Sequence, residues 1–259
     1  MKNAICVLVV LILLSGCNPV TPPITDTTYR ALLIGVGDYP GCKNDLDSPF
    51  YNVRNMQTMF EDSQPFSLIN TLTDSDATKK AIVDEIYYTF HTADSDDVSY
   101  IYYNGHGGNC DDGSCLLPYD FDDEVLTVHE LAEELEKIEG DKVVILDTCH
   151  SGGFIGKAYY DALALLSEIP NCYTITACSS DQYAWEINES VTVPEPFCVF
   201  TKAITTGVGY ADVDKDGIIT LSEIYEFAIW WIEETFNNDT YWQDVQVYPE
   251  GSTFPFLKD

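Results

Sequence analysis

Two short stretches of the sequence carry residues that can do covalent chemistry. In "ILDTCHSGG" (145–153), Cys149 follows an apolar run, and in "NGHGG" (104–108), His106 follows another one. A cysteine attacks as its thiolate, and a histidine within hydrogen-bond reach can take the thiol proton. The pair predicts nucleophilic catalysis, with Cys149 as the nucleophile and His106 as the general base.

The other histidines are poorer partners for this thiol. The chain has four, and His150 is adjacent to Cys149, where neighbouring side chains at a strand end point apart. His91 falls on a predicted helix and His129 at a predicted helix start, so we expect both at the surface. His106 is therefore the preferred base.

The glycines around His106 allow the backbone to approach a substrate closely. We expect the amides of Gly107 and Cys149 to form an oxyanion hole for the tetrahedral intermediate. The competing interpretation is structural, because a single cysteine near a strand end is often a small buried hydrophobe.

The surrounding segments alternate between strand and helix patterns. Short apolar runs predict strands at 29–36, 66–72, 97–104, 142–147 and 172–179. Helical spacing predicts helices at 48–60, 77–92, 128–140, 200–208 and 221–236, and a small hairpin is expected at 115–128. This alternation predicts βαβ units and a mostly parallel sheet, whose functional sites form beyond the carboxyl ends of the strands. Both reactive stretches lie at such ends.

The two stretches resemble the His and Cys motifs of the caspase-like cysteine peptidases, in the metacaspase-type and bacterial branch. "RALLIGVGDYPG" and "TITACSSDQYAWE" agree with the same family in order, and the resemblance covers about residues 29–236. It implies an α/β caspase-like three-layer sandwich, with a mostly parallel central sheet flanked by helices. It also implies endopeptidase activity on peptides or proteins through a Cys149/His106 dyad.

The resemblance gives Asp147 a role in the substrate pocket. In metacaspase-like relatives this acid lines the pocket for the residue before the cut bond and favours Arg or Lys, and a carboxylate pairs well with a guanidinium. Relatives often carry a second pocket Asp where this chain has Asn52, which weakens the expected charge. Trp185, with Glu186, is expected to flank the cleft. A loop-capping role for Asp147 is the alternative.

Two other functions compete with endopeptidase activity. One is a catalytically inactive, calcium-binding surface protein of caspase fold, and the other is a related cysteine transpeptidase. The presence of both Cys149 and His106 favours turnover over the inactive alternative.

Residues 212–223, "DVDKDGIITLSE", fit the EF-hand calcium loop position by position. Gly217 stands at the sharp turn, and the predicted ligands are Asp212, Asp214, Asp216, Ile218 through its carbonyl, Thr220 and Glu223. The sequence shows no paired loop, which disfavours a two-handed calcium sensor. We expect a structural Ca²⁺ ion rather than a regulatory one.

The beginning of the chain predicts export. Lys2, an apolar run and "LSGC" predict a lipoprotein signal peptide at 1–16, with lipidation of Cys17. Residues 17–28 are rich in Pro and Thr and predict a tether, leaving 29–259 as the peptidase domain. We expect a protein anchored by lipid at the cell surface or periplasmic face of a prokaryotic membrane; secretion with a free Cys17 is the alternative.

Charge and cysteine content narrow the partners. The 43 acidic residues against 12 basic ones give a net charge of −31, which argues against nucleic acid binding. Of the nine cysteines, Cys6 leaves with the leader and Cys17 is assigned to lipid. The odd number that remains leaves at least one thiol unpaired, and Cys110 with Cys115 is a candidate disulfide.

Overall fold

The fold is described here from a computed structural model of the chain. It describes residues 27–41, 43–111, 113–156, 165–190 and 192–258. The expected leader, Cys17 and nearly all of the tether lie outside these residues. Within the described ranges, no helix has the length and apolar character needed to cross a membrane.

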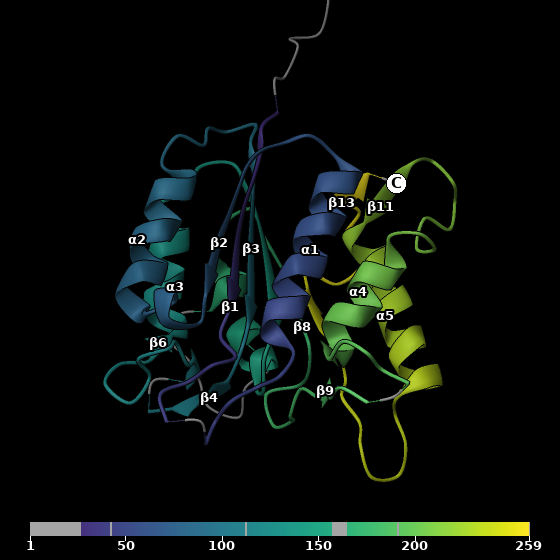
Figure 1. The fold of residues 1–259 in the computed structure, drawn as a ribbon. Helices are drawn as coiled ribbons and strands as arrows, with labels where there is room; N and C mark the ends of the chain where they lie inside the picture. The colour runs from purple at the N-terminus through teal and green to yellow at the C-terminus, as the bar shows by residue number, and fades with distance from the viewer. Residues whose placement is uncertain (1–26, 42, 112, 157–164, 191, 259) are drawn as a thin grey trace, which may run out of the picture.

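A six-stranded sheet forms the centre of the molecule (Figure 1). Its order is β12-β8-β7-β3-β1-β2, and all neighbours are parallel except β12, which runs antiparallel to β8. The strands are β1 (Tyr29–Gly35), β2 (Phe66–Thr73), β3 (Val98–Asn104), β7 (Asp141–Asp147), β8 (Cys172–Thr176) and β12 (Gln246–Tyr248). The predicted mostly parallel sheet is confirmed.

Helices cover both faces of this sheet. Figure 1 shows α2 and α3 on one side and α1, α4 and α5 on the other. Their bounds are α1 (Pro49–Ser63), α2 (Lys79–Phe90), α3 (Val128–Leu135), α4 (Val199–Gly207) and α5 (Leu221–Thr235). The three layers confirm the predicted α/β sandwich.

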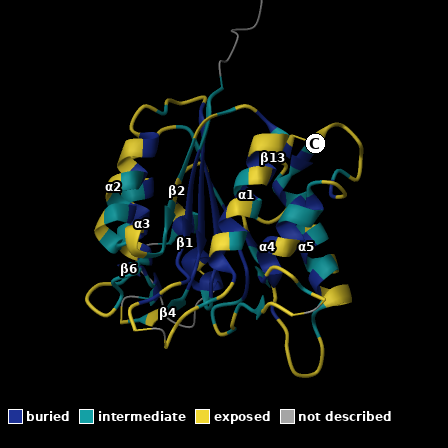
Figure 2. Cartoon of the chain, in the orientation of Figure 1, coloured by how far each residue is buried: buried dark blue, intermediate teal, exposed yellow. Residues whose placement is uncertain are grey.

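The apolar runs of the sequence are continuous because the central strands are buried on both faces. Tyr100 and Tyr102 of β3 pack into the core under α1, α4 and α5, whereas Ile101 and Tyr103 pack into the opposite core. Figure 2 shows these strands as the dark, buried centre of the molecule. Each such side chain contributes about 1.5–3 kcal/mol on burial, so the strand ends are held firmly.

Three small sheets accompany the large one in the described part of the chain. One consists of β4 (Gly107–Cys110), β5 (Gly113–Leu116) and β6 (Leu126–Thr127); the others pair β9 (Glu186–Ile187) with β10 (Phe197–Cys198) and β11 (Ile218–Thr220) with β13 (Pro255–Lys258). Three short 3₁₀ helices are η1 (Asp74–Asp76), η2 (Ser151–Ile155) and η3 (Leu166–Glu168). A disulfide joins Cys110 to Cys115 across the β4–β5 hairpin, as the sequence suggested.

One sequence prediction is confirmed but incomplete, and two others were wrong in extent. The hairpin expected at 115–128 is present as β5 and β6, but β4 adds a third strand directly after His106. The strand predicted over 172–179 ends at Thr176, where the chain turns toward Cys149. The helix predicted over 128–140 ends at Leu135, because the chain must turn before β7.

Gly140, in that turn, has a φ of +75°, and a side chain there would meet the carbonyls of Asp94 and Asp97.

Candidate active site

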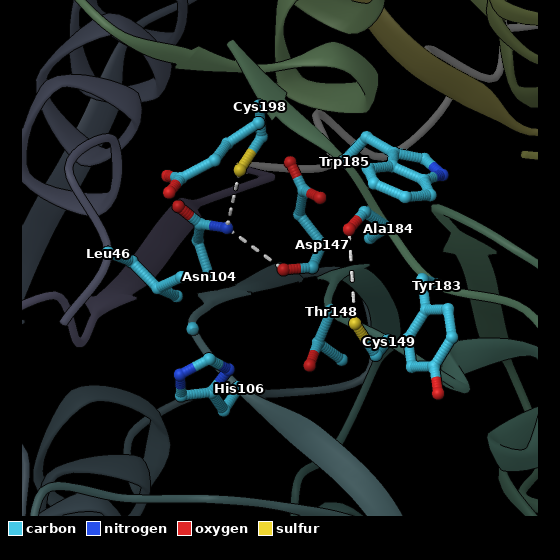
Figure 3. Close-up of a pocket in the computed structure, with 12 residues that line it drawn as sticks. Leu46, Asn104, His106, Asp147, Thr148, Cys149, Tyr183, Ala184, Trp185 and Cys198 are labelled. Carbon is cyan, nitrogen blue, oxygen red and sulfur yellow. Dashed lines mark hydrogen bonds between the residues drawn. The ribbon is translucent and has the colours of Figure 1, made fainter. Parts of the chain in front are cut away.

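A pocket of about 220 Å³ opens at the carboxyl ends of β3 and β7. His106 lies in the turn after β3, Asp147 is the last residue of β7, and Cys149 follows it (Figure 3). The pocket is lined by Leu46, Asn104, Gly105, His106, Asp147, Thr148, Cys149, Tyr183, Ala184, Trp185, Glu186 and Cys198. The structure thus brings the predicted thiol and imidazole to one cavity, with Asp147 and Trp185 in its walls.

Two residues of the loop after β1, Tyr39 and Asn44, hold His106 in place. Its ring lies 5.0 Å from the Tyr39 ring, and its backbone N–H donates to the Tyr39 hydroxyl at 2.9 Å. Nε2 lies 2.7 Å from the carbonyl oxygen of Asn44, which can only accept, so Nε2 carries a proton. In the neutral ring, Nδ1 therefore keeps the lone pair. Neither Tyr39 nor Asn44 was assigned a role from sequence.

The Cys149 thiol is turned toward the opposite wall. Its sulfur lies 3.9 Å from the carbonyl oxygen of Ala184, and no hydrogen bond joins it to His106 in the described structure (Figure 3). Burial raises the pKa of the Cys149 thiol, while the Ala184 contact acts weakly in the other direction. The Cys149 thiol therefore favours its neutral form and needs a base during attack.

Gly107 lies directly against the nucleophile loop. A side-chain carbon at this position would come within 2.2 Å of Thr148 Oγ1 and 2.7 Å of the Cys149 carbonyl oxygen. The Leu117 N–H donates to the His106 carbonyl, so alternation along the antiparallel ladder makes Gly107 and Leu116 a non-hydrogen-bonded pair. The ladder leaves the Gly107 N–H unused, next to the Cys149 backbone.

Asp147 combines the two roles considered from sequence. Its Oδ2 accepts hydrogen bonds from the Thr201 amide at 3.1 Å and hydroxyl at 2.6 Å, which caps the first turn of α4. Its Oδ1 is buried without a hydrogen-bond partner among the described residues. Burial raises the pKa of Asp147 to about 7, against the opposing effect of the Thr201 hydrogen bonds. Oδ2 therefore has a structural role, whereas the buried Oδ1 has an unused capacity to accept a hydrogen bond.

Asn52 does not line the pocket. It is fully buried in α1, and its side-chain amide donates to Asn104 Oδ1 at 2.8 Å. Asn104 in turn donates to the Asp147 carbonyl at 2.9 Å and to Cys198 Sγ at 3.3 Å. The expectation that Asn52 stands in the pocket and weakens its negative charge is corrected: Asn52 supports Asn104, which forms part of the wall. Sequence reasoning missed Asn104 and Cys198.

Trp185 lies in the wall, as predicted, and a distant segment fixes it there. Its amide donates to Gln243 Oε1 at 3.0 Å, and its indole N–H donates to the Trp242 carbonyl at 3.2 Å. Its ring meets Tyr241 edge-on at 4.8 Å. The segment before β12 therefore supports this part of the pocket wall through Trp185, which no sequence pattern indicated.

The predicted calcium loop is partly assembled. Carboxylate oxygens of Asp212, Asp214 and Asp216 lie within 4.8 Å of one another, and Gly217 has the positive φ expected at the turn. The Ile218 backbone starts β11 beside them. Thr220 and Glu223 bond each other in the capping box of α5, and the second carboxylate oxygen of Glu223 accepts from the Val213 amide of the loop at 3.3 Å. The side chains of three predicted ligands, Asp212, Asp214 and Asp216, are thus gathered.

The family model described as "Caspase domain" matches residues 28–220, most of the chain. The chain belongs to the caspase-domain family. Among curated caspase-domain relatives, metacaspase-4 of Arabidopsis thaliana is 33% identical over 150 residues, covering 51% of this chain and 35% of that protein. Metacaspase-1 of Candida albicans is 29% identical over 168 residues, covering 55% and 37%. The matched part thus spans little more than a third of the length of these relatives.

Solved structures support the same caspase-domain fold. Caspase-1 of Spodoptera frugiperda superposes with a TM-score of 0.62 at 11% identity, over 89% of this chain and 88% of that one. A Geobacter sulfurreducens protein superposes with a TM-score of 0.63 at 18% identity, over 90% and 97%. At such identities the likeness concerns the fold alone.

Proposed function

We propose that the protein is a cysteine endopeptidase that uses Cys149 and His106 and cleaves after Arg or Lys. The observation that carries the proposal is the pocket itself, which is lined by the thiol, the imidazole and an acid with one unpartnered oxygen. Membership of the caspase-domain family, a family of cysteine peptidases, supports the same activity.

The first half of the proposed reaction forms a thioester. Substrate displaces the thiol from Ala184, and His106 takes its proton at Nδ1 as the sulfur attacks the scissile carbonyl carbon. The developing oxyanion accepts hydrogen bonds from the amides of Gly107 and Cys149. His106 then gives its proton to the leaving amine, and the C–N bond breaks.

The second half returns the enzyme to its starting state. His106 removes a proton from a water molecule, whose oxygen attacks the thioester carbonyl. Collapse of this intermediate releases the carboxylic acid, and the Cys149 sulfur regains a proton from His106. The hydrogen bond from Nε2 to the Asn44 carbonyl keeps the imidazole oriented through both halves.

A basic residue before the cut bond suits the charge of the pocket. Its lining includes Asp147 and Glu186, and none of its described lining residues is Lys or Arg. A guanidinium or ammonium would reach the free Oδ1 of Asp147 and recover the hydrogen bond that this buried atom lacks. An acidic residue would meet like charge instead.

Matched fluorogenic peptides that differ only in having Arg, Lys or Asp before the cut bond test this proposal. We expect the Arg and Lys peptides to exceed the Asp peptide in kcat/KM by about 100-fold or more. Faster cleavage after Asp would refute the pocket assignment. Labelling of Cys149 by a peptidyl chloromethyl ketone separates an enzyme from an inactive relative, and product analysis with an added amine separates hydrolysis from transpeptidation.

We also propose that residues 212–223 bind a structural Ca²⁺. The donor set is all oxygen, as this hard cation prefers, and three carboxylates already converge. Closure by Glu223 would use Oε1, which accepts from the Val213 amide of the loop, and Oε2, which accepts from Thr220, so the ion would compete with these donors for the carboxylate. When bound, the ion would neutralise the converging carboxylates and tie β11 to α5.

Calcium is therefore expected to raise the melting temperature. At a free calcium concentration 100 times the dissociation constant, the gain is about 2.7 kcal/mol, a shift of several degrees for a chain of this size. Differential scanning calorimetry with calcium and with EGTA measures it, and Asp214→Asn serves as the matched variant with a reduced shift. Equal melting temperatures in calcium and EGTA would contradict the site.

The proposed setting is a membrane surface, reached through a lipid on Cys17. The sequence pattern "LSGC" supports this, and the tether would hold the domain away from the bilayer. Mass spectrometry of the mature amino terminus tests it. An unmodified Cys17, or an uncleaved leader, would contradict the anchor.

A further inference from the structure

Thr148, the residue before the proposed nucleophile, has a buried hydroxyl without a partner. The residue is 1% exposed, and its Oγ1 makes no hydrogen bond to any described residue. A buried hydroxyl in this state destabilises a folded chain. Thr148 also lines the pocket that holds Cys149 and His106. A destabilising group beside the reacting residues points to a role in the reaction.

Two other residues allow this hydroxyl to be compared with its like. In the described part of the chain, the hydroxyls of Ser99 and Thr176 are also buried without a partner. Neither residue lines the pocket: Ser99 lies near the beginning of β3, and Thr176 is the last residue of β8. The three hydroxyls share the cost of burial, but Thr148 alone among them lies at the reacting residues.

The Thr148 hydroxyl packs against the turn that carries His106. A side-chain carbon on Gly107 would come within 2.2 Å of Oγ1, so the hydroxyl lies against the backbone one residue after His106. In Figure 3 the hydroxyl points to the side of the pocket where the imidazole lies, away from the Cys149 sulfur. The Thr148 carbonyl accepts from Cys178 Sγ at 3.4 Å, which ties its backbone to the interior. The hydroxyl and the imidazole therefore share one side of the pocket.

The His106 ring needs an acceptor at Nδ1 once it is protonated. Nε2 already donates to the Asn44 carbonyl, and no described residue bonds Nδ1. In the proposed reaction the thiol proton arrives at Nδ1, which becomes an N–H on a positively charged ring. A threonine hydroxyl oxygen has lone pairs that accept such a bond, and hydrogen bonds from a charged donor are stronger than neutral ones.

We propose that Thr148 is a positioning residue whose hydroxyl oxygen accepts a hydrogen bond from Nδ1–H of protonated His106. This inference rests on the proposed endopeptidase function. The bond forms when the thiol proton reaches Nδ1 and breaks when that proton passes to the leaving amine, while Thr148 keeps its own proton throughout. Hydrogen bonds of this kind often shorten only when the substrate is bound. The bond would hold the imidazolium in the orientation from which it protonates the amine.

Thr148→Val and Thr176→Val test this inference with the same chemical change at two buried sites. Valine has nearly the shape of threonine without the hydroxyl, so each variant should keep or raise the melting temperature. We expect Thr148→Val to lower kcat by about tenfold or more with KM within about twofold, and Thr176→Val to change neither. Thr148→Ser, which keeps the hydroxyl, should restore most of kcat.

Three results would overturn the role of the hydroxyl while peptidase activity stands. They are an unchanged kcat in Thr148→Val, a loss that Thr148→Ser does not restore, and unfolding of Thr148→Val, which would show a structural role instead.

Alkylation of Cys149 by chloroacetamide separates this inference from the function on which it rests. The sulfur displaces chloride and its proton still passes to His106, so the rate, followed by peptide mapping, reports thiol activation without a peptide substrate. If the wild type cleaves no peptide, the proposed function fails and alkylation decides alone. A rate about tenfold lower in Thr148→Val and restored in Thr148→Ser supports the inference; equal rates in these variants and the wild type overturn it.

Discussion

Cys149→Ala is expected to reduce peptide hydrolysis by about 10⁴-fold or more while leaving the melting temperature within a few degrees of the wild type. No other pocket group can replace the sulfur. Cys198 is the second thiol of the lining, but burial raises the pKa of that thiol well above its ordinary value. The alanine removes one half-buried sulfur whose closest polar contact is a long one, to Ala184, so the fold loses little.

Cys172→Ala provides the matched control for this loss. Cys172 is a free, buried thiol at the beginning of β8, at the end of the sheet opposite the pocket. Its truncation is expected to cost stability on the order of 1 kcal/mol and to leave turnover intact. Substantial hydrolysis by Cys149→Ala, measured at enzyme concentrations that give a clear wild-type signal, would remove Cys149 as the nucleophile.

Asp147→Asn is expected to abolish most of the preference for a charged residue before the cut bond. The amide can still accept from Thr201 through its oxygen, so the start of α4 stays capped, but the negative charge is lost. The ratio of kcat/KM for Arg over citrulline peptides should fall by about 100-fold at pH 8. Because both peptides use the same thiol and imidazole, the ratio isolates the pocket from the chemistry.

The ratio of kcat/KM for Arg over citrulline peptides should also depend on pH. The pKa of Asp147 is raised to about 7, so this acid is mostly neutral below that value and charged above it. In the wild type, the Arg-to-citrulline ratio should rise about tenfold from pH 6 to pH 8 and then level off. In Asp147→Asn the ratio should be nearly flat. A wild-type ratio that falls as pH rises would show that the carboxylate does not serve the basic side chain.

The positions of Cys149 and His106 could be predicted because they depend on local signals. Each follows a continuous apolar strand, and the carboxyl ends of β3 and β7 are adjacent in the sheet, with Asn104 opposite Asp147. Parallel topology therefore brings the residues after the two strands together, whatever the details of the loops.

The rest of the pocket could not be predicted, because its contacts are non-local. Ser48 and Glu186 are 138 residues apart, and Trp185 and Gln243 are 58 residues apart. No periodicity or short motif encodes such pairs. Asn52 shows the limit of motif matching: it occupies the expected place along the chain, but its amide is used inside the protein to hold Asn104.

The calcium loop shows another reason why sequence prediction fails: one short pattern fits both an EF-hand loop and a helix capping box. Thr220 and Glu223 are the ninth and twelfth positions of an EF-hand loop, and they are also the ends of an S/T-x-x-E capping box. The same two residue types therefore fit both structures. In the described structure the Glu223 carboxylate accepts hydrogen bonds from the amide and hydroxyl of Thr220 and from the Val213 amide of the loop.

The antiparallel strand β12 has a consequence for self-association. It occupies the outer edge of β8, so a second copy cannot extend the sheet from that edge without displacing it. Displacing β12 would also move Gln243, whose side chain donates to the Ala177 carbonyl and accepts from the Trp185 amide. Edge-to-edge dimerisation through β8 would therefore dismantle one wall of the cavity. A sheet that continues across two copies of the chain on this side must therefore pair through β12, the outer strand of the described sheet, and not through β8.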